Sequence, residues 1–247
     1  MGMNTASVQR LYVAYFNRPG DPIALGRYEA MLPSDRLATK AELLVLAEKF
    51  FSPSAEYTTN IEGKSSAQIV DQLYQNIFGR PAEANALINW GVKLSDGTLS
   101  TAELALQLSY SAQGTDATVV SARIDAAIAF TTGLDTSEEI LGYSGDAAAA
   151  QGKVYLAQIS GALPTDDATI TAAKDSAVTN VDASIAAAVA AGNATAAQTF
   201  TLTTGIDKFT GGSGNDIFNA DNTGASEVTS TADTLDGSTG DSDTLNI

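Results

Sequence analysis

The sequence VQRLYVAYFNRP, residues 8–19, recurs 62 positions later in the changed form VDQLYQNIFGRP, at residues 70–81. In both copies, apolar side chains stand at positions i, i+3, i+4, i+7 and i+8, a spacing that places them on one face of a helix. Each copy closes with Arg-Pro, and the ring of proline disfavours the helical conformation for the residue before it. The pattern predicts a helical unit that occurs twice.

Start signals for further helices occur at corresponding places in the two units. Asp21 before Pro22 is an N-cap followed by proline at the first helical position. Residues 39–42 and 100–103 both have the capping-box pattern, a Ser or Thr with Glu three positions later. Helices are expected from these three starts to about residues 32, 51 and 110. We therefore expect three helices in each unit, and a seventh helix over residues 116–131.

Beyond residue 131 the composition shifts toward Ala, Asp, Thr and Gly. Helices are expected over residues 146–162 and 166–191, with Gly192-Asn193 ending the second. Their small side chains bury little apolar area, which favours packing on the first bundle. Residues 198–203 alternate with period two, which predicts a strand. The expected parts are a helical domain (1–131), an Ala-rich helical extension (132–197) and a C-terminal strand region (198–247).

Within the last part, residues 211–219 read GGSGNDIFN and fit the calcium-binding nonapeptide GGxGxDxUx, in which U is a large apolar residue. Its glycines allow the left-handed backbone that lets carbonyl oxygens converge on a cation. Asp216 adds a hard anionic oxygen, the kind that Ca²⁺ prefers. A single nonapeptide is also compatible with a Gly-rich turn in a solvated acidic tail, so the neighbouring sequence decides between these interpretations.

Partial copies of the nonapeptide lie on both sides of it, at residues 205–210, 233–235 and 240–245, with a polar insertion over residues 219–231. They favour a parallel β-roll whose turns stack in pairs, 211–216 facing 236–243 and 205–207 facing Asp233. We therefore predict a mainly α protein, a multi-helix bundle built on an internal repeat, followed by the first turns of a calcium-binding β-roll. The predicted Ca²⁺ ligands are Gly205, Asp207, Gly211, Gly212, Gly214, Asn215, Asp216, Asp233, Asp236, Gly240, Asp241 and Asp243.

Acidic residues are concentrated in the second half of the chain. The formal net charge is −16; residues 1–123 carry 10 Lys or Arg and 12 Asp or Glu, whereas residues 124–247 carry 3 and 17. Such a surface repels the phosphates of nucleic acids and of anionic lipid headgroups, so neither is an expected partner. The most apolar stretch, residues 185–191, is too short to cross a bilayer, and no membrane insertion is expected.

Cysteine and histidine are both absent from the sequence. Their absence excludes thiolate metal sites and the Ser-His-Asp and Cys-His nucleophile systems. Among the carboxylic acids, no pair stands out as a general acid and base. No enzymatic activity is therefore expected.

Several side chains of the helical part are compatible with either a structural or a ligand-binding role. Periodic positions favour core packing over sugar stacking for Tyr12, Tyr15, Phe16, Tyr28, Tyr74, Phe78 and Trp90. Arg18 and Arg80 are compatible with binding a phosphate or carboxylate ligand, or with satisfying the carbonyls of helix C-termini, which we favour. The acids at residues 135–139 and 166–167 are interpreted as helix caps rather than as further calcium ligands.

The repeated LYxxxFxRP helix, followed in each unit by a Leu and an aromatic residue, resembles a domain of unassigned function common in secreted Gram-negative surface proteins. The resemblance covers about residues 5–131. Together with the Ala-rich segment and the sequence FTLTTGIDKFTGGSGNDIFNA (200–220), the chain resembles the N-terminal region of RTX-type bacterial surface-layer (S-layer) proteins.

This resemblance implies that the chain anchors a surface lattice to the cell by binding the O-polysaccharide of lipopolysaccharide. The RTX part would bind Ca²⁺ and lead into the lattice-forming region, through which the full-length protein self-associates. It also implies an extracellular, cell-surface location, with export by a type I system and without an N-terminal signal peptide. On this interpretation the chain is a piece of a longer protein. Two alternatives remain open: the retention module of an RTX adhesin or biofilm protein, and the accessory region of a large secreted RTX enzyme.

Overall fold

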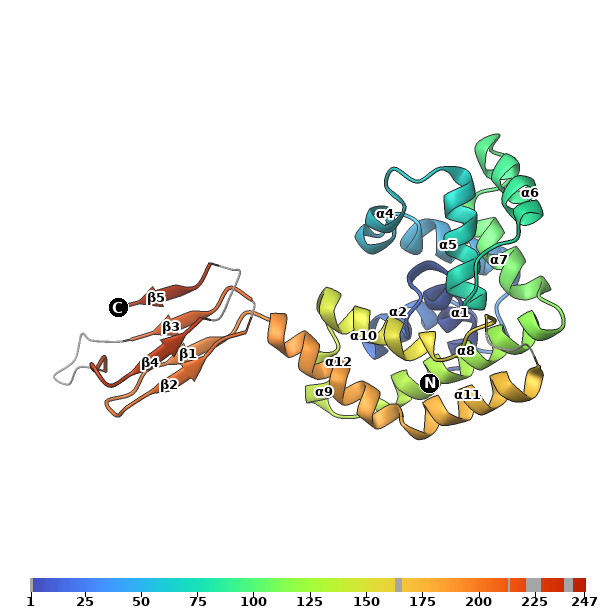
Figure 1. Cartoon of the computed structure of the whole chain (residues 1–247). Helices are drawn as coiled ribbons and strands as arrows, with labels where there is room; N and C mark the ends of the chain where they lie inside the picture. Colours follow the sequence, from blue (N-terminus) through green and yellow to red (C-terminus); the bar gives the residue numbers. More distant parts are fainter. Residues whose placement is uncertain (1, 163–165, 213, 221–227, 238–241) are drawn as a thin grey trace.

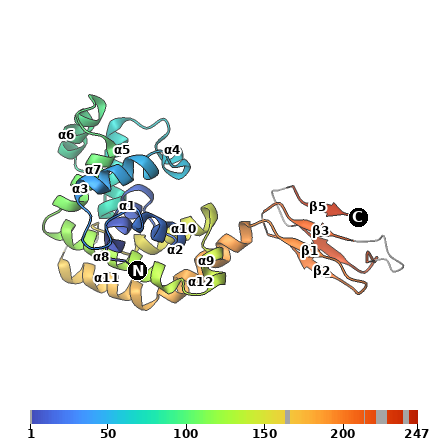
Figure 2. The ribbon, with the colours of Figure 1, turned by 180° about the vertical axis from the view of Figure 1, so that it is seen from behind.

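A computed structural model describes residues 2–162, 166–212, 214–220, 228–237 and 242–247 of the chain. The protein is mainly helical, with short parallel strands at its C-terminal end (Figure 1). The strands extend from the end of the last helix, away from the helical body, in both views (Figures 1 and 2). None of the described helices is both long enough and apolar enough to span a bilayer.

The helices and strands of the described residues are α1 (Thr5–Phe16), α2 (Pro22–Glu29), α3 (Lys40–Leu46), the π-helical turn η1 (Ala47–Phe51), α4 (Ala55–Ile61), α5 (Ser66–Phe78), α6 (Ala84–Ser95), α7 (Thr101–Ser111), α8 (Thr115–Gly133), α9 (Ser137–Gly142), α10 (Gly145–Ala157), α11 (Asp167–Thr179), α12 (Val181–Thr195), β1 (Thr199–Thr201), β2 (Lys208–Thr210), β3 (Ile217–Asn219), β4 (Thr234–Asp236) and β5 (Thr244–Asn246).

The internal repeat is a structural repeat of four helices rather than the three that the sequence predicts. Helices α1, α2 and α3 with η1 correspond to α5, α6 and α7, as expected. The short α4 was not predicted, and it occupies the place in the first unit that α8 takes in the second. Both Thr39 and Ser100 form the predicted capping boxes, at the starts of α3 and α7.

Equivalent contacts hold the loop after the first helix of each unit. Both helices end with a residue in the left-handed conformation, Asn17 (φ 55°) after α1 and Gly79 (φ 64°) after α5. The backbone N–H of Gly20 donates to Gln9 Oε1 at 3.0 Å, and that of Ala82 donates to Asp71 Oδ1 at 2.9 Å. Since 9 and 71 are again 62 apart, the repeat extends to these polar contacts.

Two hydrophobic cores lie on opposite sides of α8. Val120 and Ile124 of α8 belong to the core of the repeated units, whereas Val119 and Phe130 belong to a second core with α10, α11 and α12. The Ala-rich extension therefore packs on the first bundle through α8, as its composition predicts. The predicted aromatic residues lie in or against the first core, which favours their structural role.

The helix expected over residues 166–191 is in fact two helices, and this prediction was wrong. Asn180 separates α11 from α12 with φ −103° and ψ 20°, and its side-chain Nδ2 donates back to the carbonyl oxygen of Ser176. Local side-chain bonding of this kind competes with helix continuation. Gly192 does not end α12 either, since the helix continues to Thr195. A Cβ at Gly192 would lie 1.9 Å from the carbonyl oxygen of Gly142. The glycine is required by the close approach of α9, not by a helix cap.

The strands alternate between two parallel sheets, one with the order β1-β3-β5 and the other with the pair β2-β4. In the first sheet Phe218 pairs with Phe200 on one side and with Leu245 on the other, and in the second sheet Phe209 pairs with Leu235. The ring of Phe200 stacks on both Phe209 and Phe218, with centroids 5.0 Å apart in each case. The inner side chains of the two sheets thus form one small core.

A buried arginine joins the extension to the repeated units. Arg123 of α8 is 1% exposed. Its Nη1 donates to the carbonyl oxygen of Leu156 (2.8 Å), in the last turn of α10, and to that of Ile159 (2.6 Å), just after the helix. Its Nη2 donates to Asn17 Oδ1. Burial lowers the pKa of Arg123 to about 10, so the guanidinium remains charged at neutral pH.

We predict that Arg123→Leu lowers the free energy of unfolding by about 3 kcal/mol, because buried acceptors lose their donors. Urea denaturation of the purified protein measures this change. Arg27→Leu, at an exposed position of α2, is the control and should change the stability by less than about 0.5 kcal/mol. Equal effects of the two substitutions would contradict the joining role of Arg123.

Candidate metal centre

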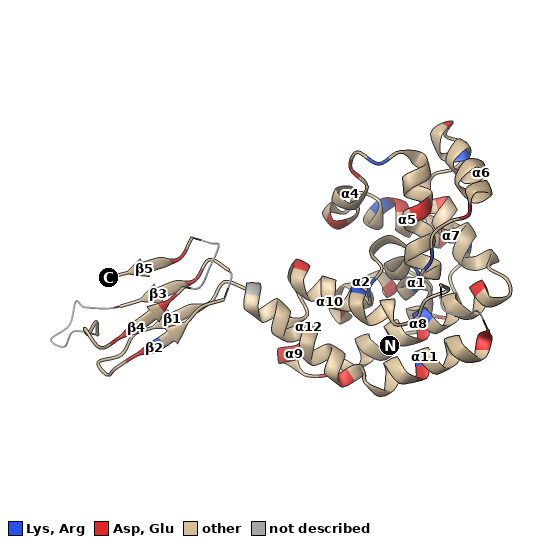
Figure 3. Cartoon of the chain, viewed as in Figure 1, with Lys and Arg blue, Asp and Glu red and all other residues tan. Residues whose placement is uncertain are grey.

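The strand region carries the densest acidic charge of the chain. Residues 198–247 contain eight Asp or Glu and one basic residue, Lys208. Acidic positions lie along the strands in Figure 3, where Lys and Arg are confined almost entirely to the helical body. The turns between strands bring these acids together in two pairs, Asp216 with Asp243 and Asp207 with Asp233. These are the pairs of facing turns that the sequence predicts.

Asp216 is the most constrained acid of the strand region. Its side chain is fully buried, and its Oδ1 accepts a hydrogen bond from the backbone N–H of Gln198 at 2.7 Å. Its own N–H donates to Asp243 Oδ1 at 2.9 Å, and its carbonyl oxygen accepts from the N–H of Thr244 at 2.8 Å. The second carboxylate oxygen, Oδ2, has no partner among the described residues. A buried anionic oxygen in this state is costly unless a cation or donor reaches it.

Two glycines make room for the carboxylates of this pair. A Cβ on Gly211 would lie 1.9 Å from Asp216 Oδ2, and one on Gly237 would lie 1.8 Å from Asp243 Oδ2. Both distances are far below van der Waals contact, so a side chain at either position would displace the acid. The glycines of the motif therefore allow each carboxylate to pack directly against the backbone of the turn.

The second pair of acids is already satisfied by the protein. Asp207 accepts from the N–H of Thr203 at 2.7 Å and from its hydroxyl at 3.0 Å, one bond to each carboxylate oxygen. Asp233 Oδ1 accepts from the N–H of Asp207 at 2.9 Å, and its Oδ2 accepts from the N–H of Ser230 at 2.7 Å. The two turn pairs are therefore chemically different, although the sequence suggests that they are equivalent.

The residues at Asp216 fit a calcium ion better than those at Asp207. Ca²⁺ takes six to eight oxygen ligands, including carboxylates and backbone carbonyls. Within the described residues no three acidic side chains come together, so backbone carbonyls would have to supply most ligands. Asp216 Oδ2 is buried and has no partner among the described residues, which favours a cation there.

The other predicted ligands take different places. Gly212 contacts the end of α12, Gly214 lies in the same turn, and Asn215 Oδ1 accepts from the N–H of Ser242 at 3.0 Å. Gly205 lies in the exposed turn before Asp207. The side chain of Asp236 is exposed on β4 and is not part of either acid pair, although its carbonyl oxygen accepts from Gly211 N–H at 2.7 Å. Gly240 and Asp241 lie outside the described residues.

Sequence reasoning missed four residues that complete the turns: Gln198, Thr203, Ser230 and Gly237. Gln198 stands 18 residues before Asp216, the distance between paired strands β1 and β3, and this spacing was available in the sequence. Thr203 and Ser230 are hydroxyl residues three or four positions before an Asp, a spacing typical of local side-chain turns. Gly237 is followed six residues later by Asp243, close to the spacing of Gly211 and Asp216.

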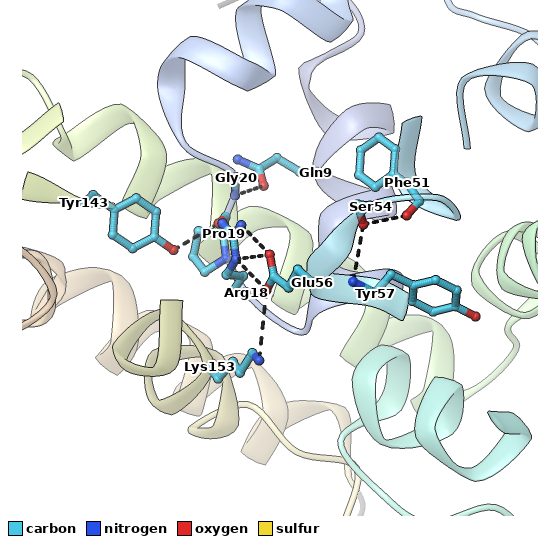
Figure 4. Close-up of polar contacts among 10 residues, drawn as sticks. All are labelled: Gln9, Arg18, Pro19, Gly20, Phe51, Ser54, Glu56, Tyr57, Tyr143 and Lys153. Atoms are coloured by element: carbon cyan, nitrogen blue, oxygen red, sulfur yellow. Dashed lines mark hydrogen bonds and ion pairs between the residues drawn. The ribbon is translucent and has the colours of Figure 1, made fainter. Parts of the chain in front are cut away.

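The arginines of the two Arg-Pro steps pair with acids of the chain, and this leaves them little capacity for a ligand. Arg18 Nη2 lies 2.8 Å from Glu56 Oε2 of α4, and Arg80 Nη2 lies 2.8 Å from Asp116 Oδ2 of α8. Each also donates to the carbonyl oxygen of the proline that follows it. Figure 4 shows Arg18 between Pro19 and Glu56, with Lys153 approaching Glu56 at 4.0 Å.

A buried hydrogen bond from the extension also holds the loop around Arg18 in place. The hydroxyl of Tyr143 donates to the carbonyl oxygen of Pro19 at 3.0 Å (Figure 4), and burial raises the pKa of Tyr143 to about 12. This tyrosine comes from the segment between α9 and α10, so the extension closes over the first unit here. These contacts therefore hold the extension against the first unit.

A surface hollow lies on α6, beside the indole of Trp90. It measures about 660 Å³ and is lined by Glu83, Asn85, Ala86, Asn89, Trp90 and Lys93. The amides of Asn85 and Asn89 are exposed, the indole of Trp90 is half-buried, and Lys93 Nζ lies 4.6 Å from the centre of the Trp90 ring. Aromatic faces and neutral amides are groups that bind uncharged sugars.

The comparison with protein families gives one match. A family described as a domain of unknown function (DUF4214) matches residues 47–115, which contain α4, the second copy of the repeated helix, α6 and α7. No curated protein and no solved structure shows a significant match to the chain.

We predict that Glu56→Gln destabilises the protein by about 2 kcal/mol, because Arg18 loses its partly buried anionic partner. Glu83→Gln is the matched control, since Glu83 pairs with Arg80 but its side chain is 61% exposed. An exposed pair of this kind contributes less than about 1 kcal/mol. Urea denaturation compares the two variants, and an equally small effect of both would contradict the buried pairing.

We also predict that Gly211→Ala removes most of the stabilisation that calcium gives to the strand region. At a hundredfold excess of Ca²⁺ over its dissociation constant, that stabilisation is about 2.7 kcal/mol for one site. Gly205→Ala should respond to calcium as the wild type does, since a Cβ there meets nothing nearer than Thr203 Oγ1 at 3.5 Å. Thermal unfolding with Ca²⁺ and with EGTA measures the difference. A full response of Gly211→Ala would contradict the site.

Proposed function

We propose that residues 198–247 form the first coils of a calcium-binding RTX β-roll. The support is the alternation of strands between two parallel sheets. Strands β1 and β3 pair with a shift of 18 residues, the length of two nonapeptides. The pairs β2-β4 and β3-β5 have shifts of 26 and 27, and the eight or nine additional residues correspond to the polar insertion within residues 219–231.

The helical part is, in this proposal, the anchor of an S-layer protein, and it binds the O-polysaccharide of lipopolysaccharide at the cell surface. The role is structural rather than catalytic, and the full-length protein assembles into a lattice. The acidic surface disfavours contact with the phosphates of the lipopolysaccharide core, whereas a neutral polysaccharide carries no such penalty. The hollow on α6 offers the aromatic and amide groups for this contact.

The observation that carries the proposal is the buried carboxylate of Asp216, whose Oδ2 has no partner among the described residues, beside strands that pair in parallel. It supports calcium binding, and calcium of millimolar concentration is found outside cells, where weak sites of this class are filled. A helical unit that occurs twice and is joined directly to such turns supports a secreted surface protein. Among secreted surface proteins, the sequence resemblance favours an S-layer protein.

Co-sedimentation with purified smooth and rough lipopolysaccharide, in Ca²⁺ and in EGTA, tests the anchor. Sedimentation with the smooth form alone, which carries O-polysaccharide, is the expected result. Loss of binding in EGTA would show that calcium bridges protein and sugar. Retained binding would show that calcium acts within the strand region and not in the contact with the sugar. Failure to sediment with either form would overturn the anchoring role and favour an adhesin or the accessory region of an enzyme.

We predict that Asn89→Ala reduces binding to smooth lipopolysaccharide at least about tenfold, the effect of roughly 1.4 kcal/mol in binding free energy. Asn89 is exposed on α6, so its removal should leave the melting temperature unchanged. Gln113→Ala, another exposed amide, lies in the loop between α7 and α8 and is the control. Equal binding by both variants would place the sugar elsewhere on the helical body.

A further inference from the structure

We propose that a cleft between α4 and α10 binds one unit of a neutral saccharide, at a site separate from the hollow on α6. The cleft lies where the first unit, the second unit and the Ala-rich extension meet. Binding there would not require that the saccharide come from lipopolysaccharide, so the site is independent of the surface-layer role.

Two adjoining hollows form the cleft. The outer hollow measures about 290 Å³, and its polar lining comes from Glu56, Thr59 and Asn60 of α4 and from Asp146 and Lys153 of α10. The inner hollow measures about 70 Å³, is more enclosed, and is also lined by Asn60 and Lys153. Together the two reach the lower end of the size range of small-molecule sites, about 300–1,000 Å³. The cleft therefore has room for a small ligand with one substituent in the inner hollow.

The cleft exists because the two helical units differ. Helix α4 has seven residues, whereas α8, which takes its place in the second unit, has 19 and buries Val119 and Ala122 in the second core. The left-handed residue after the first helix is Gly79 in the second unit and Asn17 in the first. Asparagine is one of the few other residues that adopt this conformation readily. The first unit thus places a polar side chain in the wall of the cleft.

Two amides of the inner hollow are each fixed at one end and open at the other. Asn17 Oδ1 accepts a hydrogen bond from Arg123 Nη2. Gln72 Nε2 donates to Asn76 Oδ1 at 2.9 Å, and Asn76 Nδ2 donates to the carbonyl oxygen of Ala14 at 2.8 Å. Asn17 Nδ2 and Gln72 Oε1 have no partner among the described residues. One donor and one acceptor are therefore held in place and left available to a ligand.

Asn60 and Lys153, which line both hollows, also have polar groups that the chain does not use. Among the described residues, Asn60 is bonded only through its backbone, whose carbonyl oxygen accepts from Lys64. Lys153 Nζ lies 4.0 Å from Glu56 Oε1 (Figure 4), beyond hydrogen-bond distance. Glu56 already accepts from Arg18 Nε and Nη2. The ammonium group can therefore donate to a ligand without leaving an acid unpaired.

The walls of the cleft are held in place by contacts of the protein itself. Gly152, next to Lys153, lets α10 approach the first unit, since a Cβ there would lie 2.5 Å from Tyr143 Oη and 3.2 Å from Pro19 Cδ. The hydroxyl of Tyr143 donates to the carbonyl oxygen of Pro19 in the same contact. A site whose walls are fixed before binding loses less conformational entropy when the ligand enters.

The charges around the cleft balance, which selects for an uncharged ligand. Glu56 and Asp146 contribute two negative charges, and Lys153 and Arg18 contribute two positive charges. A purely apolar ligand would leave the open amides without water or a partner, which is costly. A sugar ring is neutral, its hydroxyl groups both donate and accept, and its carbon face can contact the apolar wall that includes Phe16. A neutral pyranoside therefore meets all of these requirements.

Titration with neutral methyl pyranosides, followed by saturation-transfer NMR, tests the site. The panel consists of the methyl glycosides of glucose, galactose, mannose and rhamnose. We expect at least one of them to bind the wild type, and Asn60→Ala to weaken that binding at least about tenfold, or roughly 1.4 kcal/mol. The side chain of Asn60 has no partner among the described residues, so its removal should leave the melting temperature unchanged.

A bulky substitution separates the cleft from the rest of the surface. Thr59→Trp places an indole in the outer hollow and should abolish glycoside binding. Thr58→Trp is the matched control, because Thr58 is the neighbouring exposed residue of α4 and does not line the cleft; it should bind as the wild type does. Asn89→Ala, in the hollow on α6, should also leave glycoside binding unchanged.

The possible failures are distinguishable. If no glycoside of the panel binds the wild type, the cleft holds only water and the inference is overturned, whatever the protein does with lipopolysaccharide. Equal binding by the wild type and Thr59→Trp would also overturn it, because the sugar would then lie elsewhere. Glycoside binding that Thr59→Trp abolishes, together with no sedimentation with smooth lipopolysaccharide, would overturn the anchoring role alone and leave this site in place.

Discussion

The charge of Arg123, buried between the two cores, is the constraint on which the arrangement of the helical body depends. A guanidinium taken out of water is stabilised by hydrogen bonds, and here Nη1 and Nη2 find acceptors in two separate parts of the chain, while Nε has no partner among the described residues. Leu156 and Ile159 provide carbonyls from the end of α10, where the helix dipole favours a cation, and Asn17 provides its amide oxygen from the end of α1. The extension and the first unit are thereby fixed to the same residue of α8.

The extension makes the two helical units unequal. In the first unit, Tyr143 and Lys153 of the extension cover the Arg-Pro loop, and the side chain of Arg18 is 14% exposed. In the second unit, α6 lies at the edge of the body and exposes Ile88 and Val92 together with its two asparagines (Figure 1). The extension covers the Arg-Pro loop of the first unit, whereas Ile23 and Arg27 of α2 remain exposed.

The periodic part of the sequence predicted the helices because their formation is decided locally. Apolar spacing and capping boxes such as Thr39 with Glu42 contain all the information for a helix and its start, and the structure confirms them. The break at Asn180 involves a local hydrogen bond from its side chain to the carbonyl oxygen of Ser176, which propensity summed over the segment does not include, and the short α4 was likewise not predicted. Gly192 was interpreted as a helix end, although its role is the contact with Gly142.

The acidic turns show the same division between local and non-local information. The nonapeptide identified Asp216 and its glycines, and the pairing with Asp243 followed from the spacing. The sequence did not indicate that Asp207 and Asp233 are satisfied internally, because their partners, Thr203 and Ser230, matter only through hydrogen bonds that the folded turns create. Equivalent residues in a sequence repeat therefore do not imply equivalent hydrogen bonding in the structure.

Stability of the strand region has to come from outside its own small core. Of the apolar side chains described there, only Leu202, Phe218 and Ala220 are buried, which is little apolar area against the conformational entropy of the strands and turns. The acids add mutual repulsion, with a single Lys in the same segment. A cation at Asp216 would relieve that repulsion at the point where the strands meet α12. The helical body, with two apolar cores, has no such requirement, so calcium would order the strands on a body that is already folded.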